Sequence, residues 1–201
     1  GIALSMGVAW ASGLNLYAAI LVLGLLGTTG HVQLPETLQV LQHPVVIGAA
    51  ALMYCVEFFA DKFPGVDSAW DTVHTFIRIP AGAILAASAF AEVDPSLTLA
   101  AGLIGGGLAA GSHLAKAGTR LLVNTSPEPF SNVGVSLAED GLVVAGLGTA
   151  LFFPSLFLFL LVFFVILVLW GLPRLWRGFK RLLGPFRRGF RPGQTPSLPE
   201  P

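Results

Sequence analysis

The chain has 201 residues, of which 54% are hydrophobic and only 11% are charged. Soluble domains carry roughly 25% charged residues, so we expect an all-α integral membrane protein instead of a water-exposed globule. The formal net charge is +0 because a basic C-terminal segment balances a mildly acidic remainder, which argues against nucleic acid as a partner. The single cysteine, Cys55, excludes an intrachain disulfide and a metal site built from several cysteines.

Six apolar stretches are long enough to cross a membrane, since a crossing helix needs about 20 such residues. A polar segment from Asp61 to Arg78, which we expect to be a loop, separates the second stretch from the third. The junction at Phe153-Pro154 allows only a tight turn, so a five-span arrangement remains the main alternative. We therefore expect a transmembrane domain over residues 1–173, with spans at about 4–28, 44–61, 76–92, 96–122, 132–153 and 154–172.

The lysines and arginines lie where one orientation would place all of them on the cytoplasmic side. Seven follow the last apolar stretch, and the other four lie in the polar segment or at the end of the fourth span, namely Lys62, Arg78, Lys116 and Arg120. Six spans with this bias predict that both termini are cytoplasmic.

The C-terminal residues differ from the rest. Residues 174–191 mix Trp, Leu and Phe with Arg and Lys, a composition typical of an amphipathic helix in the interface, where anionic lipid headgroups would be its partners. The Pro-rich residues 192–201 are expected to be disordered.

A weak internal similarity relates the segment from Ser12 to the segment from Ser112, and each is followed by a Pro-Glu pair. If it is a true repeat, two three-helix halves of opposite orientation result, an arrangement found in transporters.

Ionisable residues inside the expected spans recur at helical spacing. Such groups cost several kcal/mol in a bilayer unless they pair or meet water, so the polar stripes should face one another. We therefore expect either a polar cavity that faces the cytoplasm or an ion-pair network. Asn15 and Tyr17 of the first span would line the same cavity or hydrogen-bond to a neighbouring helix. The candidate substrate- or ion-binding residues are Glu57, Asp61, Asp67, Asp71, His74, Arg78, His113, Lys116, Arg120, Glu139 and Asp140.

Structural roles compete with functional ones at several of these positions. Asp67 fits a turn or a helix cap, and Lys62 and Arg78 fit topology anchors. Glu139 and Asp140 are adjacent acids well inside a span, which favours function. For His113, a structural hydrogen bond and contact with an anion both remain open.

Enzyme motifs such as HExxH, a P-loop or GxSxG are absent from the sequence, and no cofactor is expected. Mg²⁺ is the one weak exception, because Asp67 and Asp71 with Glu57 and Asp61 could hold it through carboxylates and water. Their spacing does not identify a metal.

Three segments carry a resemblance to a known family: GLNLYAAILVLGLLG from Gly13, VEFFADKFPGVDSAWDTVHTFIRIPAGA from Val56, and SHLAKAGTRLLVNTSPEPFSN from Ser112. With them the chain resembles the DUF4126 family of uncharacterised bacterial multi-pass membrane proteins over roughly residues 5–155. The resemblance implies a protein of the bacterial inner membrane. It implies no substrate, cofactor or catalytic residue.

The leading functional hypothesis is a small inner-membrane transporter or channel with a charged polar site in the cytoplasmic half of the bilayer, for a cation, protons or an anionic solute. The first alternative is a membrane enzyme or lipid-binding protein that acts on headgroups through Asp67, Asp71, His74 and Arg78. The second is a structural or assembly protein whose charges form ion pairs only. Because the chain is small, we also expect a homo-oligomer.

Overall fold

The computed structural model of the protein describes residues 1–63, 65–123 and 129–188, without the side chains of residues 129, 172 and 175–188. These residues form helices and no strand, which confirms the all-α expectation. In chain order the elements are α1 (Ile2–Thr28), the 3₁₀ helix η1 (Glu36–Gln42), α2 (Pro44–Ala60), α3 (Val66–Ser88), α4 (Pro95–Val123), α5 (Pro129–Phe152) and α6 (Pro154–Arg188).

The outer surface is apolar and the interior is charged. Phe76 and Phe130 are 81% and 83% exposed, whereas Arg78 is 0% exposed. Among the described residues, four helices are long and apolar enough to cross a membrane, and the number rises to five if η1 and α2, bent by 63°, count as one span. These are the helices of a membrane protein, because charges turn inwards only where the surrounding medium is apolar.

The chain divides into two compact units, residues 1–165 and 166–201. In the first unit, Phe157 and Leu161 of α6 are buried in a cluster with Met6 and Ala150. In the second, the Arg174 guanidinium lies over the Trp170 ring, 3.6 Å from its centroid. Residues 174–191 are expected to form an amphipathic helix, but their side chains after Arg174 lie outside the described part of the chain. The expected disorder of residues 192–201 also concerns residues outside it.

The third helix begins at Val66, ten residues earlier than expected, so most of the polar segment that we expected to be a loop is helical. The turn before it uses Gly65, whose φ of +89° favours glycine. The Asp67 carboxylate then accepts bonds from the backbone N–H groups of Gly65 and Ser68, at 2.9 and 2.6 Å. The charged face of α3 is buried and its outer face is apolar. The mean hydropathy of the segment, which averages over both faces, is therefore too low to identify it as a membrane helix.

Helix α1 is broken in its middle. Asn15 has extended backbone angles, φ −149° and ψ 99°. Its side-chain oxygen accepts a bond from Ala18 N–H at 2.9 Å, as the N-cap of a new helix does. The first half therefore ends at Leu14, and a second half begins after Asn15.

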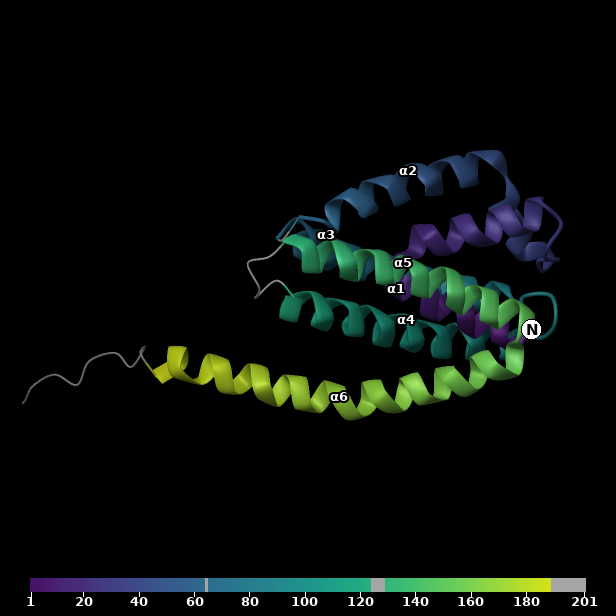
Figure 1. Ribbon diagram of the computed structural model, residues 1–201. Helices are drawn as coiled ribbons and strands as arrows, with labels where there is room; N and C mark the ends of the chain where they lie inside the picture. The colour runs from purple at the N-terminus through teal and green to yellow at the C-terminus, as the bar shows by residue number, and fades with distance from the viewer. Residues whose placement is uncertain (64, 124–128, 189–201) are drawn as a thin grey trace, which may run out of the picture. The chain divides into compact units, whose positions relative to one another are not determined.

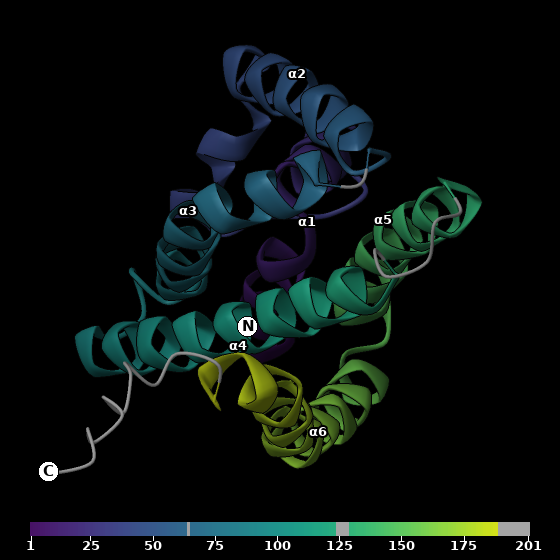
Figure 2. The same ribbon diagram turned by 90° about the vertical axis from the view of Figure 1, so that its left-hand side faces the viewer.

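The two halves of α1 return to the same end of the first unit. In the first half, Ser5 donates a hydrogen bond to Ala86 O near the end of α3. Beyond the second half, Thr37 of η1 donates to Ser88 O, two residues further along the chain. Gly1 and Thr37 line one cavity. Figures 1 and 2 show the halves as separate segments among α2, α3, α4 and α5. Thus α1 enters the bundle, reverses at Asn15 and comes back.

The expected first span at 4–28 is therefore two half-helices that meet at Asn15 and not one continuous helix. Because α1 reverses, Gly1 lies at the end of the bundle opposite Lys62. If α2 crosses a membrane, Gly1 and Lys62 then lie on opposite sides of that membrane. The inverted repeat gains no support, because α4, the counterpart of α1, is a continuous helix of 29 residues.

Both halves of α1 are almost fully enclosed, which explains why their sequence is apolar on all sides. Val8, Ala19 and Leu23 are completely buried. Gly13 makes the closest approach to a neighbour. A Cβ placed on it would collide with the Ser112 hydroxyl and the Ala109 carbonyl of α4. Only glycine therefore lets the reversal lie directly against α4.

Candidate functional site

The reversal of α1 is surrounded by charged side chains from the four helices around it. Three cations, Arg78, Lys116 and Arg120, are at most 3% exposed. They form ion pairs with four buried carboxylates, which belong to Glu57, Asp61, Asp71 and Glu139. We call these seven residues the buried network. Each lies on the inward face of its helix, in the half of the bundle where α2 ends and α3 begins.

Arg78 of α3 organises one side of the network. Its Nη2 donates to Glu57 Oε1 at 2.6 Å, and its Nη1 donates to Asp71 Oδ1 at 2.8 Å. The same Nη1 lies 3.3 Å from His113 Nδ1. Because a guanidinium only donates, Nδ1 must accept, and the imidazole proton resides on Nε2. That nitrogen donates to the Thr75 hydroxyl at 2.7 Å, so these contacts hold His113 in one neutral tautomer.

Arg120 of α4 organises the other side. Its Nη2 donates to Glu139 Oε2 at 2.6 Å and to Asp61 Oδ2 at 3.1 Å. Its Nη1 donates to the Asp61 backbone carbonyl at 2.8 Å. These bonds tie α4 to α5 and to the end of α2. Breaking one partner of such a pair leaves a buried charge without compensation.

Lys116 lies between the two arginines and reaches the end of the first half of α1. Its Nζ donates to Leu14 O at 3.1 Å, to Asp61 Oδ2 at 3.0 Å and to Glu57 Oε1 at 3.3 Å. The Leu14 carbonyl is available because the helix that would otherwise use it stops at Asn15. The break in α1 therefore supplies a hydrogen-bond acceptor to the buried network.

Asp140 of α5 lies beside the network and is held by neutral groups. Asn15 Nδ2 donates to its Oδ1, and the Tyr54 hydroxyl donates to its Oδ2, both at 3.0 Å. On the other side of α1, the Tyr17 hydroxyl lies 3.1 Å from His74 Nε2. The His74 ring also stacks on Trp70, with ring centroids 4.2 Å apart.

The network carries more carboxylates than cations. Four carboxylates and three cations give one excess negative charge, and Asp140 adds a carboxylate whose direct partners are neutral. Four buried carboxylate oxygens accept no hydrogen bond from any described residue: Glu57 Oε2, Asp61 Oδ1, Asp71 Oδ2 and Glu139 Oε1. An uncompensated negative charge in a bilayer is costly, and Lys62 is the neighbouring cation that interacts with both Asp140 and Asp61.

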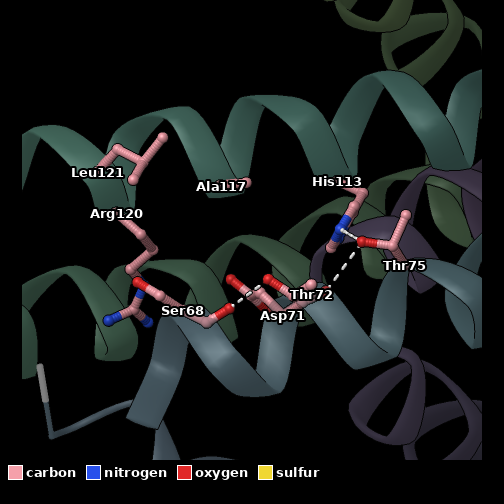
Figure 3. A pocket seen from close by; sticks show the side chains of 8 residues that line it. All are labelled: Ser68, Asp71, Thr72, Thr75, His113, Ala117, Arg120 and Leu121. Atoms are coloured by element: carbon pink, nitrogen blue, oxygen red, sulfur yellow. Dashed lines mark hydrogen bonds between the residues drawn. The ribbon is translucent and has the colours of Figure 1, made fainter. Parts of the chain in front are cut away.

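A cavity of about 140 Å³ opens between α3 and α4 beside the network. Figure 3 shows Asp71, Thr72 and Thr75 of α3 facing His113 and Arg120 of α4. The cavity is well above the ~10–15 Å³ that one water molecule needs. Its other lining residues are Ser68, Ala117 and Leu121.

The structure brings most of the predicted site residues together. Seven form the buried network, and His113 contacts it through Arg78. The bonds of His74 and Asp140 go instead to neutral residues outside the network. Asp67 is buried at the start of α3 and serves that turn. Arg78 is a central ion-pair partner and not a loop anchor. No group of three His, Cys, Asp or Glu side chains among the described residues is arranged to hold a metal ion.

The participation of the Leu14 carbonyl was not foreseen. A backbone carbonyl that is free to bind cannot be recognised from any side chain. The sequence feature that could have indicated the helix break is Asn15, a polar residue of low helix propensity two positions after a glycine in an apolar stretch. The reversal at this position is what exposes Leu14 O to Lys116.

Fold and site together define a helical membrane protein with a buried ion-pair network around a broken helix. The family profile described as "Domain of unknown function (DUF4126)" matches residues 2–174, and the chain belongs to this family. Comparisons with curated proteins and with solved structures gave no match.

Proposed function

We propose that the protein is a small membrane transporter or channel for a monovalent cation or for protons. The observation that carries this proposal is the tip of α1, where a non-helical backbone meets three cations and four carboxylates in the interior. Irregular backbone at membrane depth is tolerated only where it is buried in protein or lines a water-filled pathway. Broken helices whose ends point at ions are characteristic of transporters.

The excess of carboxylates favours a cation over an anionic solute. The seven residues of the network carry one extra negative charge, and a proton or a small cation would balance the part of it that the neighbouring Lys62 does not. Asp140 lies within reach of the α1 tip through Asn15 and adds to the negative side. The cluster would therefore take up and release a positive charge as the pathway opens to each side.

We propose that α2 to α6 cross the membrane and that α1 is re-entrant. The 23 residues of α3 extend for about 34 Å at 1.5 Å per residue, which covers the hydrocarbon core. Lys62 and Arg120 lie toward the end where α2 meets α3, so the positive-inside rule makes that end cytoplasmic. Gly1 is then on the opposite side of a bacterial inner membrane. The basic residues from Arg174 onward would contact anionic lipid headgroups.

The alternative of a headgroup-processing enzyme is less well supported. Asp71, His74 and Arg78 are at most 4% exposed and point towards other helices, whereas an interfacial site must reach the headgroups. A purely structural role for the ion pairs remains the competing hypothesis that the following experiment separates.

The test is cation and proton flux into proteoliposomes under an imposed gradient, with wild-type protein and the variants Glu139→Gln and Asp140→Asn. We expect a gradient-dependent flux that falls severalfold or more in both variants. Glu36→Gln is the matched control, because Glu36 is an exposed acid of η1 outside the network, and its flux should equal that of the wild type. Equal flux in all four proteins, or no flux in the wild type, would overturn the proposal.

A further inference from the structure

We propose that the oxygen atoms around Lys116 form a monovalent-cation site that the lysine ammonium itself occupies, and that a free alkali or ammonium-type cation competes with Lys116 for it. The inference deepens the proposed function, on which its role in transport rests. The site itself can be tested without any measurement of transport.

The geometry around the ammonium is that of an ion in a cage. Five oxygens lie within 3.7 Å of Lys116 Nζ. The nearest are Asp61 Oδ2 at 3.0 Å, Leu14 O at 3.1 Å and Glu57 Oε1 at 3.3 Å. Asp71 Oδ1 and Glu139 Oε2 complete the cage, each at 3.7 Å. These oxygens come from α1, from α2 and the residue that follows it, from α3 and from α5.

The number of oxygens exceeds what a lysine can use. An ammonium has three N–H donors, so at least two of the five oxygens attract it through charge alone. The four cage carboxylates also each have a second oxygen that accepts no bond from a described residue. A lysine therefore satisfies the cage only partly, and its flexible stem makes the compact charge a replaceable occupant.

The ligand set indicates a monovalent cation. Carbonyls at the end of an interrupted helix, together with carboxylates, are the oxygens that bind Na⁺ or H⁺ in transporters. Two arginines already neutralise much of the negative charge, through Arg78 to Glu57 and Arg120 to Glu139. When Lys116 leaves the cage, one or two positive charges are needed to balance its carboxylates, and small monovalent ions can supply them.

Access to the cage is provided by the cavity between α3 and α4. Asp71 lines this cavity and is also a cage residue, so it connects the two. The hydroxyls of Thr72 and Thr75 lie along the same wall (Figure 3). A cation that arrives there meets hydroxyl oxygens first and the Asp71 carboxylate next, 3.7 Å from Nζ.

The first experiment uses the wild-type protein in nanodiscs and measures how fast an amine reagent modifies Lys116, by mass spectrometry. We expect Na⁺ or K⁺ to raise the labelling rate of Lys116 severalfold over choline, a bulky quaternary cation that does not react with the reagent, at equal ionic strength. Lys62, which donates to Phe58 O at the end of α2, is the internal control and should not respond. Equal labelling of Lys116 in all three salts would overturn the inference.

The second experiment removes the occupant. Lys116→Ala and Lys116→Met should each be stabilised against thermal unfolding by small monovalent cations, in a saturable way, while Lys62→Met should not. Stabilisation of Lys116→Ala by methylammonium or ethylammonium would support the cage most specifically, because these ions restore the missing ammonium. If neither variant responded to any cation beyond the wild-type response, the inference would be wrong.

The two proposals fail in different ways. Flux in the wild type without any cation effect on Lys116 would overturn the cage and leave the transport proposal standing. A cation-dependent Lys116 signal without flux would support the cage and overturn transport.

Discussion

Replacing Arg78 by methionine should strongly destabilise the fold. The side chain is 0% exposed and makes two short bonds to carboxylates, at 2.6 Å to Glu57 and 2.8 Å to Asp71. Hydrogen bonds to charged groups contribute about 1.5–3 kcal/mol each, so their loss amounts to about 3–6 kcal/mol. This range agrees with the roughly 3–5 kcal/mol measured when one partner of a buried pair is removed. Total stabilities of about 5–15 kcal/mol make such a loss severe.

The assay is the free energy of unfolding in lipid bicelles. Methionine retains much of the side-chain volume of arginine, so the loss measures charge and hydrogen bonding more than packing. Glu57→Gln added to Arg78→Met should recover a substantial part of the loss, because it removes one of the two carboxylates that would then share Lys116 as their only nearby cation. Arg174→Met, at an exposed position, is the control and should change stability by less than about 0.5 kcal/mol. A loss below about 1 kcal/mol for Arg78→Met would refute the view that the network is buried and tightly paired.

Three further predictions test other parts of the structure. Gly13→Ala should destabilise the protein by about 1–3 kcal/mol, because the new methyl group collides with the backbone of α4. Gly148→Ala, with open space around it, is the control and should be neutral. The free energy of unfolding in bicelles compares the two variants. Asn15→Ala removes a cap worth roughly 0.5–2 kcal/mol and the bond to Asp140, so stability and proteoliposome flux should both fall, and unchanged flux would separate the α1 tip from function. At the start of α4, hydrogen bonds from the Ser96 hydroxyl and from backbone N–H groups hold the pKa of Asp94 below its ordinary value. The resulting stabilisation is present above that ordinary pKa and is lost as the pH falls through the lowered one. The protection factors of the amides in the first turn of α4, taken relative to the intrinsic exchange rate at each pH, should therefore fall in acid in the wild type but not in Asp94→Asn.

The polar stripes could be predicted from the sequence because helical spacing is a local property. Glu57 and Asp61 are four residues apart, and Asp71, His74 and Arg78 recur at steps of three and four. Once each stripe lies on one helical face, the cost of a lone charge in lipid requires the stripes to meet. The structure confirms an ion-pair network in which Arg78, placed initially in a loop, is one of three cations.

The reversal of α1 could not be predicted in the same way. Residues 2–28 have the length and apolarity of a crossing helix, and a half-helix that turns back is as apolar as one that continues. The difference rests on the conformation of Asn15 and on contacts far along the chain, such as Thr37 with Ser88. Without them, the positions of the cations fit a six-span topology equally well.

The start of α3 was missed because hydropathy averages over a helix. Asp67 and Asp71 lower the mean of a segment whose outer face carries Val73 and Phe76, both exposed. A segment with one charged and one apolar face has the composition of a loop but can form a membrane helix when the charged face is covered.

The most direct test of the account is the distance between spin labels at Ile2 and Glu36, measured by pulsed electron paramagnetic resonance with Cys55 replaced by serine. A reversed α1 predicts a short separation, because Gly1 and Thr37 line one cavity. A straight α1 would put residues 2 and 28 about 39 Å apart, at 1.5 Å per residue, with Glu36 at the far end. A long distance would contradict the re-entrant helix and, with it, the ion site built around its tip.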